Sequence, residues 1–309
     1  MSLILGKRIV KGMKSAVVDW ALLVLPGLIW GASFLFIAEG LTAVEPNGVT
    51  FSRIAIGFLT LSLFPAARRP VARADWAATA GLGVTWLAFP LSMFPFAEQH
   101  VSSALTGMLN GATPLFVAAV ASLLAHRLPA RGVMAGLAVG FGGAVVMALP
   151  AMGGTSSGFG IALIVLALVS YGVAINIARP LQQRYGAVPV MWRALGVALL
   201  LTMPLGLPEV LAGDWTMRPA LAMLLLGAGG TAIANVLTAT AAGRLGATRA
   251  SATAFLIPVV ALALGVLVRH EHVTVISLIG AGVCLFGAAI IRNPQILRPF
   301  VPVRLLEAR

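Results

Sequence analysis

The chain has 309 residues, of which 60% are hydrophobic and only 10% are charged, and its mean hydropathy is +1.00. Since a soluble domain carries roughly 25% charged residues, this composition excludes an ordinary soluble protein and predicts lipid as the solvent of the outer surface. We attribute the net charge of +12 to basic residues held on one side of a membrane and predict no nucleic-acid partner. The single cysteine, Cys284, can form neither an internal disulfide nor a cysteine-based metal site, and we expect no metal and no cofactor.

In chain order, a basic tail of residues 1–19 is followed by long apolar stretches with short polar connections. About 20 helical residues cross a hydrocarbon core about 30 Å thick, and the stretches are too long, and alternate too little, for strands. We therefore predict an all-α integral membrane protein with ten transmembrane helices and a C-terminal tail at residues 293–309. The predicted spans are residues 20–38, 47–67, 75–95, 101–125, 132–149, 159–178, 189–207, 219–240, 248–268 and 273–291.

The distribution of charge supports this count. With the N-terminus in the cytoplasm, most of the 21 Lys and Arg residues fall on cytoplasmic tails and connections, as the positive-inside rule requires. The exceptions are Arg218 and Arg269 on the outer side and Arg53 and Arg193 within spans. The outer connections collect Glu39, Glu45, Glu98, Glu209, Asp214 and Glu271. We predict a multi-pass protein of the inner (plasma) membrane with both termini in the cytoplasm.

The two halves of the chain, residues 20–150 and 151–292, resemble each other. A shift of about 144 residues aligns the fourth and fifth spans with the ninth and tenth, and smaller shifts align the earlier spans. The aligned pairs are Pro114 with Pro258, His126 with His270, Gly136 with Gly280, Gly143 with Gly287, Pro150 with Pro294, Trp30 with Tyr171 and Arg53 with Arg193. Because each repeat holds an odd number of helices, the second must insert upside down, and inverted repeats of this kind occur in transporters. Chance similarity between apolar helices is the alternative.

Several short motifs carry a family resemblance. They are Trp30-Gly31-Ala32-Ser33-Phe34, Arg53, the prolines Pro114 and Pro258, and Glu271-His272-Val273-Thr274 followed by Gly280 and Gly287. On these residues the sequence resembles the drug/metabolite transporter superfamily, specifically its EamA-type exporters with two five-helix repeats. The first repeat departs from the pattern, since His126-Arg127-Leu128-Pro129 lacks the acidic residue. The resemblance implies a metabolite or amino-acid exporter that works by alternating access, and it does not specify a substrate.

Polar and aromatic residues near the middle of the spans are candidates for a solute site. Trp30, Trp86, Asn110 and Tyr171 lie roughly 14–18 Å into their spans, although Trp and Tyr usually prefer the membrane interface. Two trios spaced i, i+4, i+7 each share one helix face: Thr106, Asn110 and Thr113, and Thr231, Asn235 and Thr238. The alternative for both groups is packing or hydrogen bonding between helices. The predicted substrate-binding set is Trp30, Ser33, Phe34, Trp86, Thr106, Asn110, Tyr171, Thr231 and Asn235.

Charged and helix-breaking residues are candidates for gating. Arg53 lies inside the second span, where it could bind a substrate carboxylate or pair with Glu39, because charges within the membrane usually face a pathway or a partner. Arg193 is expected to reach the cytoplasmic surface. Pro114 and Pro258 each remove a backbone hydrogen bond and favour a kink. The small residues Gly132, Gly136 and Gly140 allow close helix contact, within one subunit or across a dimer, so a monomer and a homodimer both stay open.

We therefore predict a secondary transporter that exports amino acids or similar amphipathic solutes from a site near the membrane midplane, with membrane lipid as its other partner. A lipid scramblase or a nucleotide-sugar carrier on the same fold is the alternative; a nucleotide would favour several basic residues in the cavity. An intramembrane enzyme needs a nucleophile with a base, or a metal cluster, at one depth, and all four histidines fall at span ends or connections. No carboxylate is expected deep in the membrane, and Glu39 is the nearest candidate for energy coupling.

Overall fold

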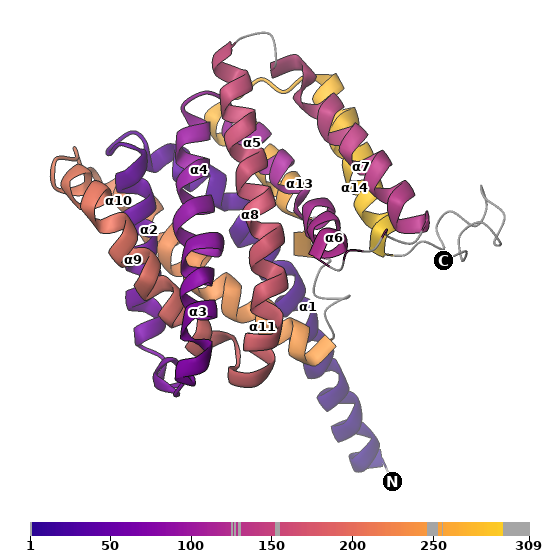
Figure 1. Ribbon diagram of the computed structural model, residues 1–309. Coiled ribbons are helices and arrows are strands. Elements are labelled where there is room, and N and C mark those ends of the chain that lie inside the picture. Colours follow the sequence, from indigo (N-terminus) through magenta and orange to yellow (C-terminus); the bar gives the residue numbers. More distant parts are fainter. Residues whose placement is uncertain are drawn as a thin grey trace.

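The computed structural model describes residues 2–124, 126, 128, 131–151, 155–245, 253–254 and 256–292. Every regular element within these ranges is helical (Figure 1), which confirms the predicted all-α class. The predicted C-terminal tail at 293–309 and part of the ninth span, within 248–255, lie outside the described residues.

The first repeat contains five helical segments, two of them broken. α1 (Ser2–Gly40) begins inside the predicted basic tail rather than at residue 20, and α2 (Pro46–Ser62) follows after a short turn. The third segment joins α3 (Trp76–Leu82), a π-helical stretch η3 (Gly83–Ala88) and α4 (Phe89–Glu98). The fourth is α5 (Ser103–Asn110) with α6 (Thr113–Leu124), and the fifth is α7 (Arg131–Ala148). Three short 3₁₀ turns lie at η1 (Pro65–Arg68), η2 (Arg73–Asp75) and η4 (Leu149–Ala151).

The second repeat follows the same plan. It runs through α8 (Thr155–Tyr185), α9 (Ala187–Leu211), a third segment of α10 (Met217–Leu224), π-helical η5 (Leu225–Ile233) and α11 (Ala234–Leu245), then α13 (Leu256–Arg269) and α14 (Val275–Arg292). Within the described residues six helical segments are long and apolar enough to cross a membrane, or seven if the bent pair α5–α6 is one span, and α13 and α14 are shorter apolar helices.

Backbone irregularities recur at equivalent places in the two repeats. His126 and His270, aligned in the sequence, adopt φ values of 49° and 55°, a left-handed conformation that residues other than glycine rarely take. The π-helical stretches η3 and η5 begin about 142 residues apart, in the third segment of each repeat. Their neighbours also correspond, since Trp30 Nε1 on α1 donates to the Gly230 carbonyl in η5 (3.0 Å), and Ser170 Oγ on α8 donates to the Thr85 carbonyl in η3 (2.7 Å). Local geometry therefore repeats along with the sequence.

The helices of the two repeats pack against each other throughout. α2 lies against α9, α1 and α5 lie against α13, and α7 runs beside α14 (Figure 1). A side chain on Gly143 would overlap the backbone at Cys284, and one on Gly287 would overlap the backbone at Gly140. The glycine ridge of α7 is therefore a contact within this chain, which explains its sequence without a second subunit. Cys284 is buried in the same contact.

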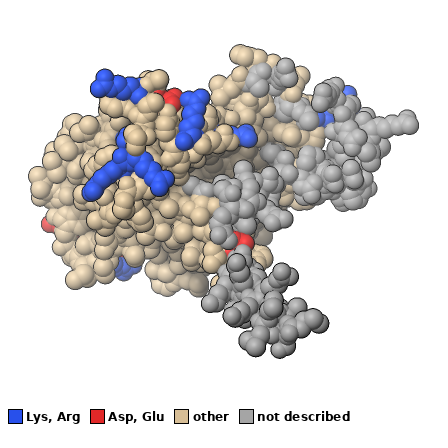
Figure 2. All heavy atoms as spheres, turned by 90° about the horizontal axis from the view of Figure 1, so that it is seen from below, with Lys and Arg blue, Asp and Glu red and all other residues tan. Residues whose placement is uncertain are grey.

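Charge separates the molecule into two ends. At the end where α1 begins, described arginines lie in the α2–α3 connection and in the last two turns of α8, and we call it the basic end; its members are Arg68, Arg69, Arg73, Arg179 and Arg184. Figure 2 looks onto this end and shows blue side chains gathered there. The opposite, acidic end carries Glu39, Glu45, Glu98, Glu209 and Glu271. At the basic end Asp75 accepts hydrogen bonds from Tyr185 (2.6 Å) and Arg184 (3.2 Å), which ties the α2–α3 connection to α8.

Candidate functional site

Three aromatic rings from three helices meet in the core between the repeats. The rings of Phe34 on α1 and Phe94 on α4 lie 5.6 Å apart at 75°, and the Phe94 and Tyr171 rings lie 6.0 Å apart at 30°. Phe34 and Phe94 are buried, whereas Tyr171 on α8 is half-buried. We call these three residues the aromatic cluster. The sequence singled out Phe34 and Tyr171 but not Phe94, which reads as one more apolar residue in a phenylalanine-rich segment.

A buried cation lies near the aromatic cluster. Arg53 on α2 is only 5% exposed, and its Nε donates to Thr231 Oγ1 at 3.2 Å. Its charge and the Tyr171 hydroxyl act on each other electrostatically. No carboxylate in the described part of the chain lies within ion-pair distance of Arg53. The predicted alternative in which Arg53 pairs with Glu39 is therefore wrong, because Glu39 has other partners.

Those partners form an ion network at the acidic end. Glu39, 6% exposed, pairs with Arg218 Nε at 2.6 Å and with Arg269 Nη1 at 2.9 Å. These arginines are the two outer residues that depart from the charge rule, and their pairing with a buried carboxylate explains the departure. Arg269 also approaches Glu271, at 3.7 Å. Glu271 accepts hydrogen bonds from the backbone N–H groups of Ser103 (3.1 Å) and Ala104 (2.8 Å), so it caps α5.

Glu98, at the last turn of α4, is a carboxylate that the sequence reasoning missed as a site residue. Both of its carboxylate oxygens are shut off from solvent and have no hydrogen-bond partner among the described residues. The charges of Arg53, Arg269 and Glu271 act on this carboxylate. Its place at the end of a span makes it count as a connection residue in the sequence, and only the packing of neighbouring helices shows that it is covered.

The remaining predicted residues fall into two groups. Trp30 and Ser33 lie on the face of α1 that meets η5, the stretch that contains Thr231. A side chain on Gly230 of η5 would contact Ser33 Oγ. Asn235 donates to the Thr231 carbonyl at 3.0 Å, so it braces the π-helical stretch that holds the partner of Arg53. This group and the aromatic cluster frame one region between the repeats.

The second group lies apart from Arg53 or is bound to its own helix. Thr106 is fully buried and its hydroxyl donates to the Ser102 carbonyl at 2.9 Å. Asn110 ends α5, and its carbonyl accepts the Thr113 hydroxyl at 2.6 Å. Trp86 lies in η3 and packs against a second core cluster, which α9 helps to form and which Tyr171 also borders.

Both prolines predicted as kink sites lie close to the break in the fourth span. α5 and α6 meet at an angle of 41°, and Pro114 is the second residue of α6. Pro258 lies in the first turn of α13, and a side chain on Gly111, within the break, would overlap its ring. The broken helix of one repeat therefore packs against the proline of the other.

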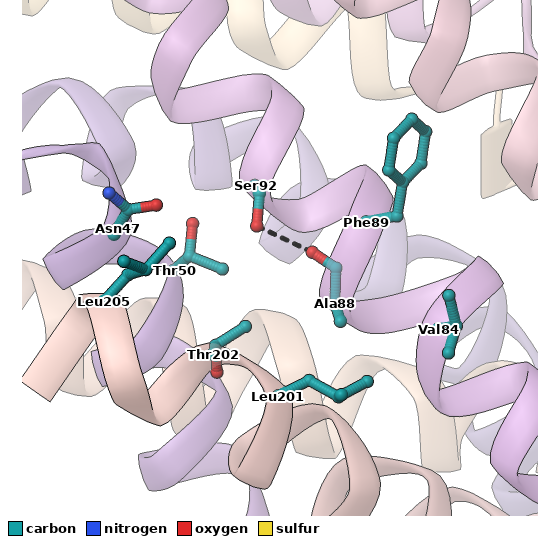
Figure 3. Close-up of a pocket in the computed structure, with 9 residues that line it drawn as sticks. All are labelled: Asn47, Thr50, Val84, Ala88, Phe89, Ser92, Leu201, Thr202 and Leu205. Carbon is teal, nitrogen blue, oxygen red and sulfur yellow. Dashed lines mark hydrogen bonds between the residues drawn. The ribbon is translucent and has the colours of Figure 1, made fainter.

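A separate hollow of about 240 Å³ opens between α2, η3, α4 and α9 (Figure 3). Its lining residues are Asn47, Thr50, Val84, Ala88, Phe89, Ser92, Leu201, Thr202 and Leu205. The hydroxyls of Thr50, Ser92 and Thr202 already donate to backbone carbonyls. None of the predicted site residues lines this hollow, and it lacks a charged group that could orient a solute.

The whole-chain comparisons agree with this architecture. The profile of the EamA-like transporter family matches residues 20–149 and again residues 158–293. This chain belongs to that family. It is 28% identical to a "Probable terminal-alkyne amino-acid exporter" of Streptantibioticus cattleyicolor, over 91% of this chain and 95% of the relative. It is 26% identical to the "Uncharacterized transporter YdfC" of Bacillus subtilis, over 84% of this chain and 86% of that protein.

A solved crystal structure matches the EamA chain with a TM-score of 0.60 at 19% identity, covering 94% of this chain and 99% of the other. At that identity the likeness concerns the fold. The family match confirms the resemblance seen in the motifs and, with the all-helical structure, the fold class of an all-α membrane protein built from two repeats. The chain is a multi-pass membrane transporter that handles small molecules, and it is not an enzyme.

Proposed function

We propose that this EamA transporter exports amino acids or similar small amphipathic solutes by alternating access, with both termini in the cytoplasm. The observation that carries the proposal is Arg53, a buried cation near the aromatic cluster that has no carboxylate partner among the described residues. An uncompensated charge within a membrane protein is costly to retain. A solute carboxylate would neutralise it, and the aromatic rings would receive the solute's apolar part.

Two further points support this class of solute. The relative from Streptantibioticus cattleyicolor is named as an amino-acid exporter. Among the described lysines and arginines, Arg53 alone is buried in the core, whereas a nucleotide would favour several cations at its phosphates. The proposed orientation follows from the charge of the two ends, since basic residues are retained in the cytoplasm.

Exchange in proteoliposomes tests the function. Vesicles holding purified protein and an excess of unlabelled L-propargylglycine, L-leucine or L-phenylalanine are diluted into the same labelled amino acid. We expect transient, saturable accumulation of at least one of them. Arg53→Ala should reduce this exchange by tenfold or more, about 1.4 kcal/mol or above. Empty vesicles give the background.

The repeat mate Arg193 offers a matched control. Its guanidinium donates to the carbonyls of Pro189 (3.1 Å) and Ala67 (3.3 Å) at the basic end, so Arg193→Ala should leave the solute's affinity unchanged. Exchange of none of these amino acids by the wild-type protein would contradict the proposal. Equal losses of exchange in Arg53→Ala and Arg193→Ala would show that Arg53 is not part of the solute site.

A further inference from the structure

An acidic side chain with buried carboxyl oxygens, Glu98, and a buried basic side chain, Arg53, lie in the same part of the core without an ion pair between them. The charges of Glu98 and Arg53 act on each other, yet no ion pair joins them. Glu98 has no hydrogen-bond partner among the described residues. Arg53 is hydrogen-bonded through Nε to Thr231, which leaves its two terminal nitrogens for a bidentate carboxylate.

The other charges around Glu98 already have partners. Glu39 on α1 is held by Arg218 and Arg269. Glu271, after α13, caps α5 and lies near Arg269. Glu45, before α2, accepts a hydrogen bond from Gln99 at 3.5 Å. Within the described core this leaves Glu98 and Arg53 as the buried acid and base that lack an ionic partner.

The energetics favour a ligand that satisfies both groups at once. Burying a charge is expensive unless it is paired and hydrogen-bonded, and removing one partner of a buried pair is strongly destabilising. An acid and a base that form no ion pair with each other therefore gain most from a ligand that carries both charges on neighbouring atoms. An α-amino acid is such a ligand, because its ammonium and its carboxylate lie on the same carbon.

We propose that Glu98 and Arg53 form a receptor for a zwitterion, in which Glu98 accepts hydrogen bonds from the α-ammonium and Arg53 donates to the α-carboxylate. The solute's side chain lies toward the aromatic cluster, whose Phe94 is on the same helix as Glu98. This assignment rests on the proposed amino-acid export and names the protein groups that select a free amino acid over a simple acid or amine. Only one of the two residues stands out in the sequence.

Competition by truncated solutes tests the receptor. Exchange of labelled L-leucine is measured against unlabelled L-leucine, 4-methylpentanoate (which lacks the ammonium) and leucine methyl ester (which lacks the carboxylate). We expect the wild-type protein to prefer L-leucine over both analogues by tenfold or more. Glu98→Gln should lose the preference for L-leucine over 4-methylpentanoate and keep the preference for L-leucine over the ester. Arg53→Gln should show the reverse pattern.

Controls separate selectivity from folding. Glu98→Gln keeps the size of the side chain and removes a buried charge, so its thermal midpoint in detergent should equal or exceed that of the wild type. Glu45→Gln alters a partnered carboxylate at the same end and should leave the pattern of competition unchanged.

The outcomes distinguish this receptor from the export function itself. If the wild-type protein exchanges L-leucine and Glu98→Gln keeps the full preference over 4-methylpentanoate, the receptor is overturned and the export function stands. A second outcome also overturns the receptor. In it, Glu98→Gln keeps the preference for L-leucine over 4-methylpentanoate, but its exchange no longer depends on the proton gradient as that of the wild type does. Glu98 would then hold a proton and would not bind the ammonium. If the wild-type protein exchanges no amino acid, both proposals fail.

Discussion

At the scale of residues, two arginines aligned by the repeat have opposite surroundings. Arg193 donates to two backbone carbonyls at the basic end, as expected for a side chain that reaches the surface. Arg53 is buried and has a single described hydrogen-bond partner, the Thr231 hydroxyl. The inverted repeat explains the difference, because the same position falls near opposite faces of the membrane. Sequence identified both arginines, but their partners depend on which helices pack beside them.

Glu98 shows why the site could be predicted only in part. Arg53 stands out because a cation interrupts an apolar span, and Tyr171 stands out by its depth. Glu98 ends a helix, where carboxylates are common, and nothing local in the sequence says that α4 is covered there. The helices α2 and α8 that pack against α4 are distant from Glu98 in the chain. Such long-range burial is not encoded in spacing or periodicity.

The link between Arg53 and Thr231 yields a prediction at this scale. Thr231→Val keeps the shape of a buried side chain and removes the oxygen that accepts from Arg53 Nε. A buried cation that loses a hydrogen bond should lower the free energy of unfolding by about 1–3 kcal/mol. The thermal midpoint in detergent measures this change. Thr240→Val, exposed on α11, is the matched control, and equal midpoints in both variants would contradict the assigned contact.

At the scale of elements, each of the ten predicted spans corresponds to a helical segment within the described residues, but the interruptions of these segments were predicted unevenly. The break between α5 and α6 coincides with Pro114, which the sequence marks clearly. The π-helical stretches η3 and η5 carry no such mark, because their residues are ordinary helix formers and glycines. Their equivalent places in the two repeats indicate that packing imposes them. η5 also presents Thr231 to Arg53 and Gly230 to Trp30, so this irregularity helps to position the candidate site.

The contact between α7 and α14 gives a prediction with an adjacent control. A side chain at Gly143 would overlap the backbone of α14 at Cys284, whereas one at Gly142 would meet open space. Gly143→Ala should therefore force the helices apart and lower stability by about 1–3 kcal/mol. Gly142→Ala should be neutral or should stabilise the helix by roughly 0.5–1 kcal/mol. Thermal unfolding in detergent compares Gly143→Ala with Gly142→Ala. Similar midpoints for the two variants would show that close packing of Gly143 does not stabilise the contact between α7 and α14.

At the scale of the whole molecule, the carboxylate caps at the acidic end break the symmetry of the repeats. Glu209 accepts from the Gly48 N–H at 2.6 Å and caps α2, just as Glu271 caps α5. Both glutamates come from the second repeat and hold helices of the first. In the sequence alignment Glu271 corresponds to Arg127, and Glu209 corresponds to Arg69. An arginine cannot accept a backbone N–H, and α9, the counterpart of α2, has no side-chain cap from its own N-cap residue, Gly186.

Under the proposed alternating access, this asymmetry predicts that closure of the acidic end is more strongly stabilised than closure of the basic end. Each hydrogen bond to a carboxylate contributes about 1.5–3 kcal/mol, and a capping charge also favours the positive end of a helix dipole. Glu271→Gln weakens these terms without removing the side chain. It should therefore raise the population open at the acidic end by tenfold or more if about 1.4 kcal/mol is lost.

Labelling from the acidic side measures that population. A cysteine replaces Thr106, which is fully buried on the helix capped by Glu271, in a Cys284→Ala background. A membrane-impermeant maleimide should then react faster when Glu271→Gln is added and at the original rate when Glu45→Gln is added. Glu209→Gln should act in the same direction as Glu271→Gln, because it frees the other capped helix. Unchanged rates in both capping variants would mean that the caps hold individual helices in place without setting the balance between the two closures.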